Sequence, residues 1–238
     1  MKVIPHPESW LQYAPKIEMK NQRLGIFAHC YVKNGEQENI KKAYKKIVDI
    51  AIEENTCSVL SASQSLVLPN HNMLYEEWFD YDEFFKIQLT KTYRNTFYRW
   101  LDPIRKGPIS PEFTRILYSS GEHPTEIAPQ NAFALIRRYQ IQPNNYDNAY
   151  QLLKDYVENT DGNDKRIFVN AHQSLNEPNH FLLYEIWLDF SELIKSELHF
   201  NVKTNLDQQL EKTAPKDQPQ TCVEAFQIYY DPKKYHSQ

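Results

Sequence analysis

Glycine is scarce in this chain, which has only five glycines in 238 residues, whereas proteins average about 7%. The sequence accordingly contains no GxGxxG pattern and no Walker loop, the glycine-rich turns that hold nucleotide phosphates. We therefore expect no nucleotide cofactor bound in such a turn.

Cysteines and long apolar runs are also few. The three cysteines, Cys30, Cys57 and Cys222, are widely spaced and form no CxxC pair, which is typical of reduced thiols in the cytoplasm. No stretch of about 20 apolar residues is present to span a membrane. The first twenty residues carry prolines and charges and do not resemble a secretory signal. We expect a cytoplasmic protein.

Basic residues are not in excess either. Lysine and arginine total 27 against 31 aspartates and glutamates, giving a net charge of −4. Without a basic stripe, we expect neither nucleic acid nor an anionic membrane as a partner. Aromatic residues make up 13% of the chain, which indicates a packed globular protein.

A segment of 26 residues occurs twice, 109 positions apart. Residues 64–89 read QSLVLPNHNMLYEEWFDYDEFFKIQL, and residues 173–198 read QSLNEPNHFLLYEIWLDFSELIKSEL. Fourteen of the 26 positions are identical, with no gap, so the chain contains an internal repeat. We expect an extension at 1–22, a first unit at 23–121, a linker at 122–131, a second unit at 132–230 and a tail at 231–238.

Each unit is predicted to be β-α-β-β-α-β. In unit one (23–121) we expect strands at 24–32, 58–64 and 113–118, a third strand carrying LYEEWFD, and helices at 36–54 and from about Asp82. Unit two (132–230) follows the same order, with its second helix starting near Ser191. A sheet with helices on one face leaves the other face bare, and two copies can cover each other. We therefore expect an α+β fold of two ferredoxin-like units fused in tandem, with their sheets packed face to face around a cavity.

The pattern P-N-H-F-x-L-Y-E-x-W-x-D in the third strand resembles the antibiotic biosynthesis monooxygenase (ABM) superfamily. Unit two fits better, with Phe181, Ile186 and Leu188 where unit one has Asn72, Glu77 and Phe79. The resemblance implies a dimeric α/β barrel. Several members oxidise quinols or anthrone-type aromatics with O₂ and without metal or flavin, and others degrade haem.

The third strand carries most of the candidate site residues. Alternation along a strand places Leu182, Tyr184, Ile186 and Leu188 on one face, and Leu183, Glu185 and Trp187 on the other. We expect the first face to pack on the helices and the second to form a pocket wall. Glu185 would accept a phenolic proton and Trp187 would stack on an aromatic substrate. The alternative is that Glu185 pairs with an arginine and Trp187 fills the core between the sheets.

Other candidates surround this strand. His180 is a candidate base, and Arg137 on the first strand is a candidate anion clamp or partner of Glu185. The alternative for His180 and its counterpart His71 is turn capping. The candidate substrate-binding residues are Trp187, Tyr184, Asn179, Trp78 and Glu76.

Haem chemistry and metal chemistry are less favoured. Haem-degrading relatives use an asparagine on the first strand and a histidine on the following helix. This chain has Ala28 or Arg137 at the first position and Gln88 or Glu197 near the second. The histidines His172, His180 and His199 show no compact ligand spacing. We expect no cofactor and no metal.

Two classes of function remain. The first is a cofactor-independent monooxygenase that acts on a small electron-rich aromatic molecule with O₂. The second is a non-enzymatic barrel that binds a small ligand or serves as a scaffold. A homodimer beyond the internal pair is left open. If there is a pocket, we expect it in unit two, which keeps Ile186 and Arg137 where unit one has Glu77 and Ala28.

Overall fold

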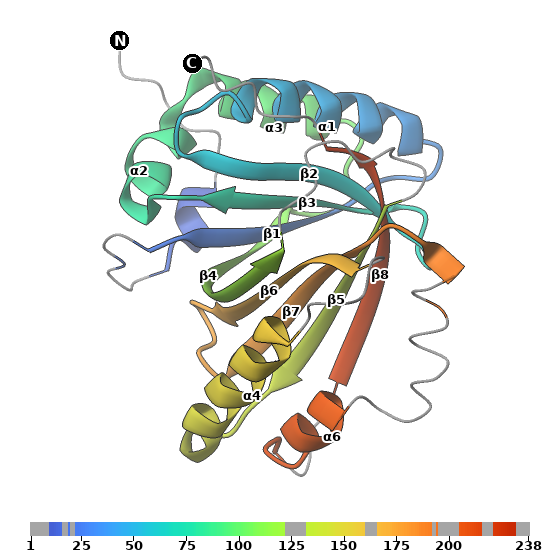
Figure 1. The fold of residues 1–238 in the computed structure, drawn as a ribbon. Coiled ribbons are helices and arrows are strands. Elements are labelled where there is room, and N and C mark those ends of the chain that lie inside the picture. Colours follow the sequence, from blue (N-terminus) through green and yellow to red (C-terminus); the bar gives the residue numbers. More distant parts are fainter. Residues whose placement is uncertain are drawn as a thin grey trace.

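The computed structural model shows one closed barrel of eight strands with helices on its outside (Figure 1). It describes residues 10–15, 19, 22–121, 132–159, 166–191, 194, 205–215 and 221–231. The expected extension, linker and tail fall largely outside the described residues. Among the described residues, no helix combines the length and apolarity needed to cross a membrane.

Each unit contributes four strands. Those of unit one are β1 (Leu24–Tyr31), β2 (Cys57–Ser65), β3 (His71–Trp78) and β4 (Ser110–Gly121). Those of unit two are β5 (Phe133–Gln140), β6 (Arg166–Ser174), β7 (His180–Trp187) and β8 (Thr221–Tyr230). Every neighbouring pair is antiparallel. Strand β4 runs to Gly121, the last residue expected for unit one.

The last strand of each unit closes the barrel. Strand β4 pairs with β1 of its own unit and with β6 of the other, and β8 pairs with β5 and with β2. Around the barrel the order is β1-β3-β2-β8-β5-β7-β6-β4, so a shift of four places carries each strand onto its counterpart in the other unit. That order is what a pseudo-twofold axis along the barrel axis produces. The expected tandem α+β barrel is confirmed.

Helices cover the outside of both units (Figure 1). Unit one has α1 (Gln37–Ala51), α2 (Tyr81–Lys86) and α3 (Thr92–Leu101), and unit two has α4 (Tyr146–Glu158) and α6 (Asn205–Glu211). The apolar residues of α1 recur at spacings of three and four and are buried. Helix α2, expected from about Asp82, begins at Tyr81 and is capped by Asp80, whose side chain accepts the Glu83 amide.

The two faces of the third strands lie opposite to the expectation. Leu182, Tyr184 and Ile186 belong to the core inside the barrel, whereas Leu183 packs with the helix residues Leu153 and Val157. The prediction that the Tyr184 face meets the helices was therefore wrong. Alternation does show which residues share a face. It cannot show which face points inward, because closure buries both.

Aromatic rings from both units fill the barrel. Tyr75 and its counterpart Tyr184 stack with ring centroids 3.9 Å apart. Phe27 lies 5.1 Å from Tyr75 and 5.8 Å from Tyr184, and Phe168 and Phe226 belong to the same cluster. The two sheets thus share one core, which each unit alone would expose to water.

Gly25 in β1 gives a test of this interior packing. A methyl group there would lie 2.7 Å from Thr114 Oγ1 and 2.8 Å from the His172 ring. We expect Gly25→Ala to lower the free energy of unfolding by ~1–3 kcal/mol, because a packed interior resists added volume. Urea unfolding measures this, and the loss should shrink in a His172→Ala background. An unchanged midpoint for Gly25→Ala would contradict the packing.

Candidate functional site

Glu185 lies at the centre of a buried polar cluster on the helix-covered face of unit two. It comes from β7 and is fully buried. Its Oε1 accepts hydrogen bonds from the Tyr156 hydroxyl of α4 at 2.7 Å and from Arg166 of β6 at 2.9 Å. Its Oε2 accepts a longer one, 3.4 Å, from Arg137 Nε of β5. The carboxylate therefore holds a phenol against two guanidinium groups.

Arg137 extends the cluster to a second carboxylate. Its Nη1 lies 3.3 Å from Asp207 Oδ2 on α6, and the Tyr139 hydroxyl donates to Asp207 Oδ1 at 2.7 Å. Two arginines thus face two carboxylates in a largely buried site, where each group has a partner of opposite charge. Burial together with the nearby carboxylates raises the pKa of the phenols of Tyr139 and Tyr156, so both stay protonated.

Trp187 borders this cluster and has an unsatisfied donor. Its side chain packs with Phe133 and Leu135, and the Arg166 guanidinium lies over its ring at 5.6 Å. Only 3% of the residue is exposed, yet among the described residues its Nε1–H has no hydrogen-bond partner. A buried indole N–H normally has one, so this donor is free to meet an acceptor on a ligand.

In unit one, the equivalent tryptophan and glutamate are hydrogen-bonded by residues of the same unit. Trp78 Nε1 donates to Glu76 Oε2 at 2.8 Å, and Arg94 of α3 holds both oxygens of Glu76 at 3.3 and 3.0 Å. Trp10 and Trp78 flank the Arg94 guanidinium, whose carbon lies 5.6 and 5.3 Å from the two rings. Every side-chain polar group of Glu76 and Trp78 is therefore hydrogen-bonded. In this cluster the Nε of Arg94 has no partner among the described residues.

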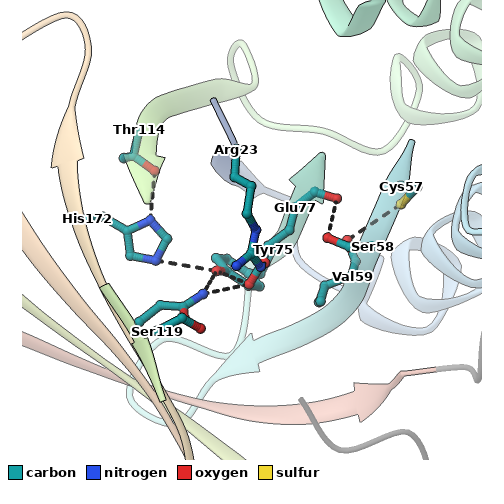
Figure 2. A network of polar contacts seen from close by, with 10 residues as sticks. Arg23, Cys57, Ser58, Val59, Tyr75, Glu77, Thr114, Ser119 and His172 are labelled. Carbon is teal, nitrogen blue, oxygen red and sulfur yellow. Dashed lines mark hydrogen bonds and ion pairs between the residues drawn. The ribbon is translucent and has the colours of Figure 1, made fainter. Parts of the chain in front are cut away.

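A second buried network lies inside the barrel, around Glu77 (Figure 2). The Tyr75 hydroxyl donates to Glu77 Oε1 at 2.7 Å, and Asn170 Nδ2 of unit two donates to the same oxygen at 2.6 Å. Arg23 forms an ion pair with Oε2. Sequence reasoning missed this network and treated Glu77 as a sign of drift in unit one. Its partners lie on distant strands, so no local pattern signals it.

His172 joins the same network from the unit-two side. Its Nε2 lies 3.3 Å from the Tyr75 hydroxyl, and its Nδ1 lies 2.9 Å from Thr114 Oγ1, as Figure 2 shows. Burial lowers the pKa of His172 to about 3, so the ring is neutral. Burial also raises the pKa of the Glu77 carboxyl, although Arg23 opposes this. The network fixes the two units against each other.

Known structures resemble the whole chain. A protein from Fusobacterium nucleatum assigned as a monooxygenase superposes with a TM-score of 0.74 at 17% identity, over 91% of this chain and 96% of that one. One from Lactobacillus acidophilus, assigned in the same way, gives 0.68 at 7% identity, over 90% and 97%. An anthrone oxidase-like protein gives 0.65 at 10% identity, over 92% and 98%. No family model matches the sequence, and no curated protein matches it.

The chain shares the fold of these proteins over nearly its whole length. Because the match covers nearly all of this chain and nearly all of each of the three structures, the fused two-unit barrel is a recurring architecture. Identities this low transfer the fold and not the chemistry.

The barrel brings together some of the predicted site residues and separates others. Glu185, Arg137 and Trp187 meet in unit two, and the pairing of Glu185 with an arginine is as the alternative expected. Tyr184 lies on the other side of the sheet, inside the barrel. Asn179 lies in the turn before β7, and its carbonyl accepts the Ile141 amide. His180 is the first residue of β7, and its Nδ1 is 2.7 Å from Glu177.

The two third-strand tryptophans form a matched pair for mutation. Trp78→Phe removes a hydrogen bond that a buried carboxylate accepts, whereas Trp187→Phe removes an N–H that has no partner among the described residues. Both changes remove the same volume from a buried site. We expect Trp78→Phe to lower the unfolding free energy by ~1–3 kcal/mol more than Trp187→Phe. Denaturant unfolding of both variants checks this, and equal losses would show that the Trp187 N–H is satisfied in solution.

Glu77 predicts a pH dependence of stability. The pKa of the Glu77 carboxyl is raised in the folded state, so ionising this carboxyl lowers the free energy of unfolding. Below about pH 4 the carboxyl is protonated in both the folded and the unfolded state, and this loss of stability is absent. The loss develops as the pH rises through the folded-state pKa. Glu77→Gln does not titrate, so its unfolding free energy should gain on the parent protein between pH 5 and pH 8. Urea titrations at both values test this, and a constant difference would contradict it.

Proposed function

We propose that this chain is a cofactor-independent monooxygenase that oxidises a small electron-rich aromatic molecule, of the quinol or anthrone type, with O₂. The reaction centre is the helix-covered face of unit two, at Glu185, Arg137 and Trp187. The observation that carries the proposal is the buried Nε1–H of Trp187, which has no partner in the part of the chain that the structure describes, whereas its unit-one counterpart is satisfied. The fold shared with proteins assigned as monooxygenases supports it.

The cluster already binds a phenol. The Tyr156 hydroxyl donates to Glu185 while Arg166 and Arg137 flank the carboxylate. A substrate hydroxyl in the place of Tyr156 would meet the same groups. Glu185 would then accept its proton, and the two guanidinium groups would stabilise the resulting phenolate.

Trp187 supplies the other contact. Its N–H would donate to a carbonyl or phenolate oxygen of the substrate, and its ring would stack on the aromatic system. Beyond it, Leu188 and Phe190 are 36% and 42% exposed, and Phe190 packs against Phe133 with centroids 4.9 Å apart. This apolar rim suits an aromatic substrate approaching from solvent.

The chemistry needs no cofactor, because the substrate supplies the electrons. A desolvated phenolate or enolate reduces O₂ directly, and the two radicals combine at carbon. For an anthrone-type methylene, one oxygen atom becomes the new carbonyl. The other leaves as water with the two methylene hydrogens, so atoms and electrons balance.

A non-enzymatic barrel is the second candidate. The interior is filled by stacked rings such as Tyr75 and Tyr184, and every oxygen of Glu185 already has a donor. Such packing is what a scaffold requires. Oxygen uptake separates the two functions, since a scaffold consumes no O₂ with any substrate.

The test is oxygen consumption with a panel of hydroquinones and anthrones in metal-free buffer. We expect Glu185→Gln and Trp187→Phe to lower kcat/KM by about tenfold or more, as the loss of one hydrogen bond in a buried site does. The matched controls Glu76→Gln and Trp78→Phe should change it by less than twofold once their folding is verified by circular dichroism.

Other outcomes are informative. Equal losses from both pairs would indicate two equivalent pockets. Unfolding of the unit-two variants alone would show that these residues are core, and no oxygen uptake with any compound would rule out the proposed reaction.

A further inference from the structure

The barrel has a polar mouth that plays no part in the proposed reaction. Where β1 ends and β3 begins, a cavity of about 390 Å³ is lined by His29, His71, Glu112, Arg138 and Glu224, together with Tyr31. These residues come from five strands of both units. The cavity lies on the inner side of the barrel wall, whereas the proposed reaction centre lies under the helices.

Pseudo-symmetry explains how the mouth is built. Glu112 pairs opposite Phe27 and Glu224 pairs opposite Ile136, and these two partners are 109 residues apart. The carboxylates are therefore counterparts, one from each unit. His29 and Arg138 are also 109 apart and touch, with Arg138 Nη2 3.2 Å from His29 Nε2. One counterpart is a cation and the other is an imidazole.

The charge of the mouth favours a cation. Arg138 forms ion pairs with both Glu112 and Glu224, so its single charge is shared by two carboxylates and the set carries −1. His29 and His71 add imidazole nitrogens, which are common metal ligands.

Two of these ring nitrogens converge. His29 Nδ1 and His71 Nε2 are 2.9 Å apart, and Glu224 offers an oxygen such that all three ligand atoms lie within 4.8 Å of one another. Two nitrogens bound at right angles to one ion at ~2.1 Å would be ~3 Å apart. Two imidazoles and a carboxylate on one side of an ion, with open positions opposite, form the facial donor set of several transition-metal sites.

We propose that the barrel mouth binds one divalent transition-metal ion through His29, His71 and Glu224, with the cavity leaving positions open for water or a small ligand. This departs from the metal-free expectation, which rested on histidine spacing along the chain. The three donors come from β1, β3 and β8, and only barrel closure brings them together.

Arg138 competes with the metal. While it donates to His29 Nε2, the His29 proton sits on Nδ1, facing His71. When a metal ion binds Nδ1, the proton of the neutral ring moves to Nε2, so Arg138 can no longer donate there and keeps only its two carboxylate partners. Removing the guanidinium should therefore strengthen binding, because it removes a positive charge beside the ion.

The experiment titrates the full chain with Co²⁺, followed by its visible absorption, and with Zn²⁺, followed by calorimetry. We expect saturable binding of one ion per chain. His71→Ala and Glu224→Gln should each weaken it by at least tenfold, and Arg138→Met should tighten it by about tenfold. The matched control is His180→Ala, which removes the counterpart of His71 and should leave binding unchanged.

Circular dichroism establishes that each variant is folded, and Glu224→Gln decides the result if His71→Ala is not. Absence of saturable binding in the parent protein, or equal affinity in the parent and Glu224→Gln, would overturn the proposal. Because oxygen uptake is measured separately in metal-free buffer, failure here leaves the proposed reaction standing, and the reverse also holds.

Discussion

Everything in this structure depends on covering one bare face of each four-stranded sheet. Each unit buries its outer face under helices and leaves an inner face with large aromatic side chains, Phe27 and Tyr75 in unit one and Tyr184 in unit two. Exposing these side chains to water would destabilise the unit. The two inner faces meet, Tyr75 stacks on Tyr184 at 3.9 Å, and β4 and β8 each cross to the other unit to close the barrel. Fusion in one chain supplies the partner that a single unit would have to find by association.

Closure also lets the two units diverge in a coordinated way. A residue near the pseudo-twofold axis faces its own counterpart or that counterpart's neighbours. A polar substitution in one unit can therefore be satisfied from the other. Glu77 replaces an apolar position occupied by Ile186 in unit two, and Asn170 of unit two donates to it at 2.6 Å. Arg138 likewise meets Glu112 of unit one. The positions at which the two units differ therefore include residues that form polar contacts between the units.

The repeat was enough to predict the fold, because a gapless offset of 109 residues implies two similar units and each unit needs its inner face covered. The sites were harder to predict. Strand alternation grouped Glu185 with Trp187 correctly, but it placed Tyr184 against the helices, since both faces of β7 are buried. The Glu77 network and the His29–His71 pair each combine strands far apart in sequence. No local pattern records such contacts, so they become visible only when the barrel is closed.

The two E-x-W motifs show where specificity arises in such a duplicated barrel. Both third strands present the same glutamate and tryptophan to the helix side, yet the outcomes differ because the covering residues differ. In unit one, α3 supplies Arg94, which takes both oxygens of Glu76 and leaves Trp78 N–H bound to that carboxylate. In unit two, α4 supplies Tyr156 and the neighbouring strands supply Arg137 and Arg166, which pair with Glu185, and no described residue accepts the Trp187 N–H. The strand motif therefore fixes where the glutamate and the tryptophan lie, and the residues packed over them decide which of their polar groups are paired.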